Sequence, residues 1–151
     1  MLAKPTKILV PIDFSNAADQ ALDYGAQVAD WLGASLCVLH CTPMGDLVHA
    51  AASARHPEKA VEIVEHEDQA RLQKRVERMA VGGQHPKAIL RVGPAPATIL
   101  DVAGEEGADL IVMSTHGRTG LRHAVIGSVA EEVVRKSPIP VLTFRPSKTT
   151  D

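Results

Sequence analysis

Aromatic side chains are scarce in this sequence: 3% of its 151 residues are aromatic, against 45% hydrophobic residues overall. The core must therefore be built from Ala, Val, Ile and Leu. Long apolar runs are missing as well, since none approaches the roughly 18 residues that a membrane span needs. The apolar run Ile8–Ile12 near the start of the chain is too short for a secretory signal. We therefore expect a cytoplasmic protein without a membrane partner.

A strong charge of either sign is also missing. The formal net charge is −2, and Lys and Arg are scattered rather than gathered into a stripe, which disfavours nucleic acid as a partner. On a strand over residues 35–41, Cys37 and Cys41 would lie roughly 13 Å apart, too far for a disulfide. The seven histidines show no spacing typical of metal ligands, so no metal site is expected.

Short apolar runs alternate with helical periodicity along the chain. The length fits one domain, which we place at residues 1–146, with a frayed tail at 147–151. Strands are expected at residues 7–12, 35–41, 87–92, 109–114 and 141–144. A first helix is expected from the N-cap Ser15 to Gly33 and a second from about residue 58 to 80. A third is expected around residues 99–103 with Gly107 as its stop, and a last one from near Ser128. Residues 42–57 are expected to be an irregular insert.

This alternation predicts a doubly wound α/β domain: a five-stranded parallel sheet of order 3-2-1-4-5 with helices on both faces. Ligands of such sheets bind beyond the carboxyl ends of the strands, where the strand order reverses. The segments Pro11–Asp13 and Ser114–Gly120 follow strands one and four. We expect them to converge on one crevice.

The segment after strand four is rich in glycine and leads into the last helix. Backbone N–H groups at a helix N-terminus, with glycines at points of close approach, can cradle phosphates. The same residues have a simpler interpretation, in which Gly117, Gly120 and Gly127 shape a surface loop and Ser128 with Glu131 forms a capping box. Neither a Walker A loop nor a Rossmann fingerprint is present.

One spacing within this segment resembles a known signature. Gly117 is followed by the nine residues 118–126 and then by the pair Gly127-Ser128, as in the ATP-binding signature of universal stress proteins, although Ser114 replaces its first glycine. The resemblance extends from Ile8–Ser15 to the final run Pro140–Leu142. The chain is thereby similar to the universal stress protein family over nearly its whole length.

The resemblance implies that the protein binds ATP, with or without Mg²⁺. Around the adenine and ribose it places Pro11, Ile12, Asp13, Cys41 and Met113. Around the phosphates it places Gly117, Arg118, Gly127, Ser128 and Val129, and the Ser114 hydroxyl can also donate to a phosphate. Only a residue without a Cβ at position 127 is expected to leave the phosphate approach clear.

Three functions fit these features. The first is an ATP-responsive signalling module in which occupancy changes residues 42–57 and 118–126, and which forms a homodimer through the edge strand Pro140–Phe144 and binds an unknown protein partner. The second is a nucleotide-free dimeric interaction protein, which Ser114 keeps open. The third is a slow ATPase, although no nucleophile and base pair accompanies the cradle and no catalytic residue is assigned. Trp31 is expected at the edge of the core, and most histidines on the surface or in loops.

Overall fold

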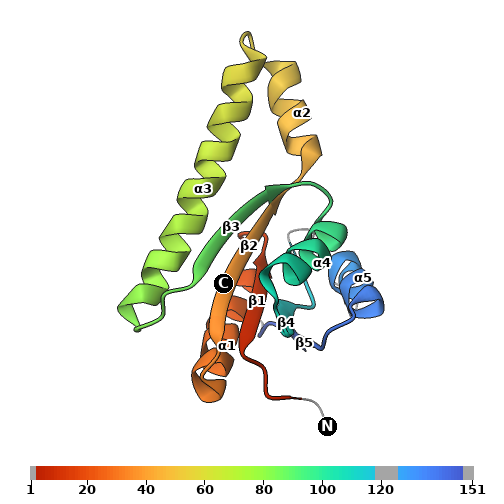
Figure 1. Ribbon diagram of the computed structural model, residues 1–151. Coiled ribbons are helices and arrows are strands. Elements are labelled where there is room, and N and C mark those ends of the chain that lie inside the picture. Colours follow the sequence, from red (N-terminus) through yellow and green to blue (C-terminus); the bar gives the residue numbers. More distant parts are fainter. Residues whose placement is uncertain (1–2, 118–125, 148–151) are drawn as a thin grey trace.

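The computed structural model describes residues 3–117 and 126–147 as a parallel sheet with helices on both faces (Figure 1). The strand order is β3-β2-β1-β4-β5, which confirms the predicted fold. The elements, in chain order, are β1 Lys7–Ile12, α1 Asn16–Leu32, β2 Ser35–Thr42, α2 Met44–Ser53, α3 Pro57–Val81, β3 Lys87–Val92, α4 Ala95–Glu106, β4 Leu110–Ser114, α5 Ser128–Lys136 and β5 Val141–Phe144.

Helix α1 begins and ends at the predicted residues. The Ser15 side chain accepts a hydrogen bond from the Ala18 amide, and Gly33 ends the helix in the left-handed conformation with φ 65°. Gly25 lets the helix lie close to the sheet, because an added Cβ would stand 2.7 Å from a Val10 methyl carbon. Helix α1 is thereby fixed against β1, the strand that leads into the expected crevice.

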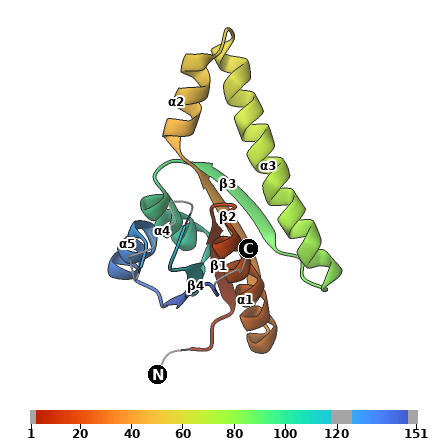
Figure 2. The same cartoon turned by 180° about the vertical axis from the view of Figure 1, so that it is seen from behind.

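The sheet separates two apolar layers, because successive strand residues point to opposite faces. On one face Ile8, Val10 and Val38 pack with residues of α1 and α3. On the other face Leu9, Leu39 and Ile111 pack with residues of α4 and α5. Figure 2 shows the helices on the two faces of the sheet from behind. Within the described residues, no helix combines the length and apolar composition needed to cross a membrane.

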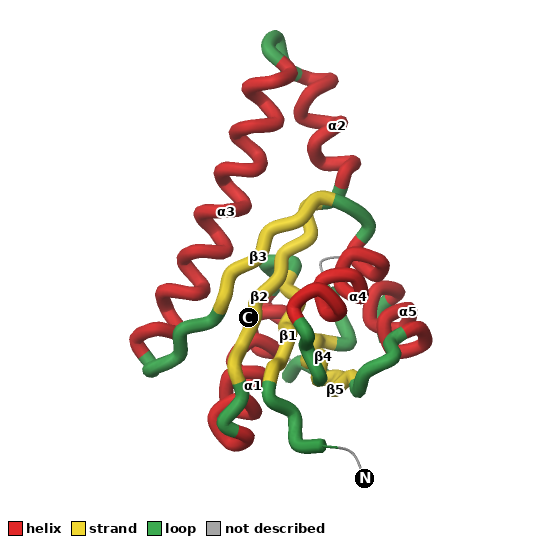
Figure 3. Tube along the Cα trace, in the orientation of Figure 1, coloured by secondary structure: helices red, strands yellow, loops and turns green. Residues whose placement is uncertain are grey.

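The expected irregular insert at residues 42–57 is wrong, because most of it forms helix α2. Pro43 precedes the first turn with φ −63°, and the run Ala50–Ala52 favours a helix more than the single Gly45 opposes it. Helices α2 and α3 form a hairpin that extends beyond the sheet (Figure 3). The hairpin leaves the body directly after β2, close to the end of β1.

Trp31 also differs from the expectation. It is 71% exposed and its ring lies T-shaped to the Tyr24 ring, with centroids 6.4 Å apart. Tyr24 in turn stacks on Phe144 of the edge strand. The buried stripe of α1 passes through Gly25, Val28 and Ala29, so Trp31 lies off the stripe that faces the core.

Asp109 ties the start of β1 to the start of β4. Its carboxylate accepts hydrogen bonds from the backbone N–H groups of Thr6 and Lys7 at 2.9–3.0 Å and from the Thr6 hydroxyl. Partial burial raises the pKa of Asp109, but the hydrogen bonds from Lys7 and Thr6 outweigh burial and hold the pKa below its ordinary value of 3.8. The ionised carboxylate therefore stabilises the fold.

We expect Asp109→Asn to lower the free energy of unfolding at neutral pH by about 1–2 kcal/mol, because hydrogen bonds to a charged acceptor are lost. A depressed folded pKa gives stability that is present above the unfolded pKa and is lost as pH falls through the folded pKa. The difference between parent and variant should therefore shrink towards about pH 3. Urea unfolding at both pH values measures it, and a difference that stays constant would contradict this role.

Candidate functional site

A cavity of about 420 Å³ lies at the carboxyl ends of β1 and β4, where the strand order reverses. The two segments expected to converge there do so. The structure brings together every predicted site residue except Arg118, which lies outside the described residues. Those that line the cavity are Pro11, Ile12, Asp13, Cys41, Met113, Ser114, Gly117, Gly127, Ser128 and Val129.

The Asp13 carboxylate joins the turn after β1 to the loop after β4. One oxygen accepts hydrogen bonds from the Ser15 amide at 3.0 Å and the Ser15 hydroxyl at 2.5 Å. The other oxygen faces Gly117, where an added Cβ would stand 2.8 Å from it. Glycine at position 117 thus lets the two segments approach, and the carboxylate is held in place on the cavity wall.

The loop after β4 is closed by its own hydrogen bonds. Gly127 donates its N–H to the Thr115 carbonyl oxygen at 2.5 Å, and His116 donates its N–H to the Ser114 hydroxyl oxygen at 3.1 Å. Ser114 sits there without strain, since Phe14 is the one non-glycine residue with positive φ in the described chain. The Ser114 hydroxyl still has its own proton to donate.

These contacts correct the expectation for Gly127. Its N–H is engaged by Thr115, and an added Cβ would stand 3.1 Å from the Thr115 oxygen. A valine at position 127 would therefore press on the Thr115 carbonyl group in the empty protein as well. Substitution of Gly127 is therefore expected to change the stability of the protein as well as the approach of a phosphate.

The predicted cap of the last helix is also wrong. Helix α5 begins at Ser128, so Gly127 is the N-cap and no side chain caps the helix. Glu131 pairs with Arg135 instead, at 3.4 Å. The N–H groups of Ser128, Val129 and Ala130 consequently have no partner within the helix, and all three residues line the cavity. With the positive end of the helix dipole, this turn suits an anion.

Part of the cavity wall is apolar, which suits an aromatic base. This apolar part of the wall is formed by Leu39, Ile99 and Met113, which belong to the buried cluster on the α4 and α5 side of the sheet. The cavity as a whole therefore offers a carboxylate, an apolar surface and a helix N-terminus.

Sequence reasoning missed two groups at the site. Pro43 and Asp46, from the start of α2, line the cavity, and their position just after the end of β2 was the available signal. His40 was not singled out among the histidines, yet its residue exposure is 2% and its Nδ1 lies 2.8 Å from the Ile12 carbonyl oxygen. Its place in the apolar run of β2 was the signal.

In the described part of the chain no group of three His, Cys, Asp or Glu residues is arranged to hold a metal ion.

Fold and cavity together define the class: a doubly wound α/β domain with a ligand cavity at the reversal of strand order. Residues 5–145 match the model of the universal stress protein family. The chain belongs to this family.

Individual relatives agree along nearly their whole length. Universal stress protein MJ0577 of Methanocaldococcus jannaschii is 30% identical over 152 residues, covering 92% of this chain and 94% of that protein. The solved structure of MJ0577 has a TM-score of 0.84 at 26% identity, covering 97% of this chain and 100% of that one. A universal stress protein from Archaeoglobus fulgidus, solved in complex with dAMP, has a TM-score of 0.61 at 26% identity, covering 95% of this chain and 98% of that one.

The Cys41 thiol of the cavity wall should be unreactive. Burial raises its pKa to about 12, and the nearby Arg91 charge offsets this only in part. Since the thiolate is the nucleophile, alkylation at about pH 8 should be about a thousandfold slower than for a thiol with the ordinary pKa of 9.0. Iodoacetamide labelling followed by mass spectrometry measures this, with urea-unfolded protein as the control. Rapid labelling of Cys41 in the folded protein would contradict it.

Proposed function

We propose that the cavity binds ATP. The observation that carries this proposal is that Asp13 and the first turn of α5 line one cavity whose wall also includes the apolar side chains of Leu39, Ile99 and Met113. A carboxylate suits ribose hydroxyls, an apolar slot suits adenine, and a helix N-terminus suits phosphates. A family member that is 26% identical has been solved in complex with dAMP, which supports an adenine nucleotide.

The proposed roles follow the chemistry of each part of the wall. The Asp13 carboxylate accepts from ribose hydroxyls. Cys41 and Met113 contact the adenine through apolar surface. The backbone N–H groups of Ser128 and Val129, together with the Ser114 hydroxyl, donate to phosphate oxygens.

We further propose that the protein is a cytoplasmic signalling module rather than an enzyme. Pro43 and Asp46 line the cavity at the start of α2, so a bound nucleotide would lie against the hairpin of α2 and α3. Binding or loss of the nucleotide can therefore shift the conformational equilibrium of the hairpin. The hairpin extends beyond the sheet, where a partner protein can reach it. The two free cysteines fit a reducing compartment.

Asp13→Asn tests the nucleotide proposal. The amide keeps an acceptor oxygen for Ser15 but loses the negative charge offered to the ribose. We expect ATP affinity to fall by about 1–2 kcal/mol, roughly 5- to 30-fold, in isothermal titration calorimetry. Asp23→Asn is the matched control, because Asp23 lies on α1 in an exposed pair with Arg78 and should leave affinity unchanged. A parent protein without measurable ATP affinity would refute the proposal.

We also propose a homodimer through β5, an edge strand of the sheet. Val141 and Leu142 are half-buried in the single chain, so pairing would cover apolar surface that remains. Light scattering at micromolar concentration should give twice the 16.1 kDa chain mass. Thr143→Lys, which puts a charge on the exposed middle of this edge, should shift the mass to that of one chain. A parent mass of one chain would contradict the dimer.

A further inference from the structure

Phe14 carries a backbone conformation that needs support from its neighbours. Its φ is 65°, and a bulky residue in the left-handed region is a genuine outlier. It directly follows Asp13, so its backbone sets the direction in which the chain leaves β1. Whatever holds Phe14 therefore also holds the turn that carries the Asp13 carboxylate.

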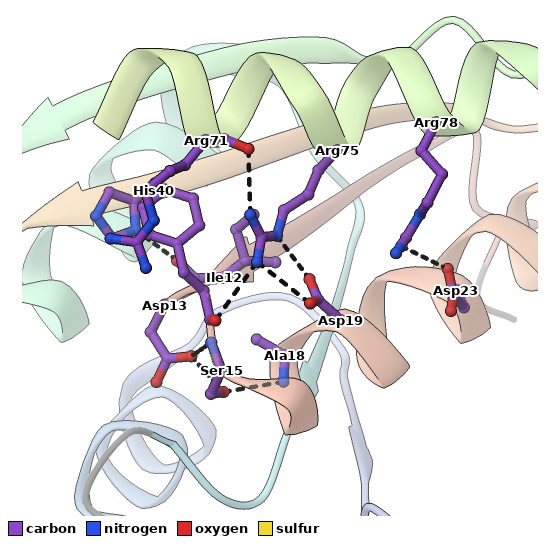
Figure 4. A network of polar contacts seen from close by, with 11 residues as sticks. Ile12, Asp13, Ser15, Ala18, Asp19, Asp23, His40, Arg71, Arg75 and Arg78 are labelled. Carbon is purple, nitrogen blue, oxygen red and sulfur yellow. Dashed lines mark hydrogen bonds and ion pairs between the residues drawn. The ribbon is translucent and has the colours of Figure 1, made fainter. Parts of the chain in front are cut away.

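The Phe14 ring is held between β2 and α3. On one side it stacks on the His40 ring, with centroids 4.0 Å apart and planes 29° apart. The guanidinium groups of Arg71 and Arg75 lie 4.2 Å and 4.8 Å from its centroid. Arg75 also donates to the Phe14 carbonyl oxygen at 3.4 Å and is anchored by Asp19 at 2.6 Å (Figure 4).

His40 reaches the residue on the other side of Asp13 as well. Its Nδ1 lies 2.8 Å from the Ile12 carbonyl oxygen, and because a carbonyl oxygen only accepts, Nδ1 carries the proton. Its Nε2 lies 3.4 Å from the Asp68 carboxylate, which accepts a hydrogen bond from the Thr42 hydroxyl at 2.7 Å. Protein groups thus lie against both ring nitrogens.

We propose that His40 is a positioning residue for nucleotide binding, an inference that rests on the proposed function. It bonds to Ile12 and stacks on Phe14, the two chain neighbours of Asp13, and so fixes the Asp13 carboxylate against Gly117 on the cavity wall. Asp68 of α3 lies beside the other ring nitrogen of His40. Helix α3 thereby contributes to the ribose site through His40, without itself lining the cavity.

Two substitutions of similar size separate the contacts of His40. His40→Asn keeps an N–H on the atom bonded to Cγ, where Nδ1 stands, and so keeps a donor for the Ile12 carbonyl group. His40→Gln moves the N–H one atom further, towards Asp68, and loses the donor to Ile12. Both lose the stacking on Phe14; Asn keeps the donor to Ile12, and Gln keeps the donor towards Asp68.

We expect His40→Gln to weaken ATP binding by about tenfold or more, and His40→Asn to recover affinity to within about threefold of the parent. Calorimetry below the melting temperature of each variant measures affinity separately from stability. A purely structural His40 would lower both melting temperatures and leave ATP affinity unchanged in each folded variant. Equal affinities in the two variants, whether parental or weakened, would overturn the inference.

Two arginines of α3 provide the test if the His40 variants do not fold. Arg75→Gln removes one of the two guanidinium groups over Phe14 and the hydrogen bond to the Phe14 carbonyl oxygen, and should weaken ATP binding several-fold. Arg78→Gln is the matched control. It breaks the exposed ion pair of Arg78 with Asp23, a pair that also joins α3 to α1 but does not contact Phe14, and it should leave ATP affinity unchanged. Equal affinities for these two variants would overturn the inference, while a parent that does not bind ATP would overturn the proposed function and the inference together.

Discussion

The reversal of strand order between β1 and β4 is the constraint on which the site depends. In such sheets the chain connections on the two sides of the reversal run to opposite faces, which opens a crevice at the carboxyl ends of these two strands. The contact of the Asp13 carboxylate with Gly117 bridges the opening. A cavity at this point therefore follows from the topology, and its chemistry follows from the few residues that end the two strands.

Local signals were sufficient for much of the fold. The Ser15 cap and the Gly33 stop delimit α1, and the apolar runs of five strands gave the parallel sheet, because both depend on neighbouring residues. Helix α2 was not predicted, because Pro43 and Gly45 are typical of irregular segments, whereas the alanines that follow favour a helix. The Ser128 cap was missed because a helix start one residue away turns a capping side chain into the first residue of the helix.

Side-chain environments were harder to predict, because they depend on contacts distant in sequence. His40 is polar in an apolar run, and its burial becomes favourable through groups distant in sequence, chiefly the Ile12 carbonyl group of β1. Gly127 was predicted to present its N–H to a ligand, yet the loop folds back so that Thr115 accepts it. The two segments that converge on the cavity were predictable from the strand ends, and further site residues followed from the family resemblance, whereas the hydrogen bonds that hold them there were not predictable.

Hydrogen–deuterium exchange with and without ATP tests the central claim most directly, because it locates the ligand on the backbone. The account predicts slowed exchange in residues 13–18 and 128–131. A second cavity, of about 290 Å³ at the amino ends of β2 and β3 and lined by Asp30 and Gln84, should show no change. Slowed exchange confined to that second cavity, or no slowing anywhere at saturating ATP, would contradict the account.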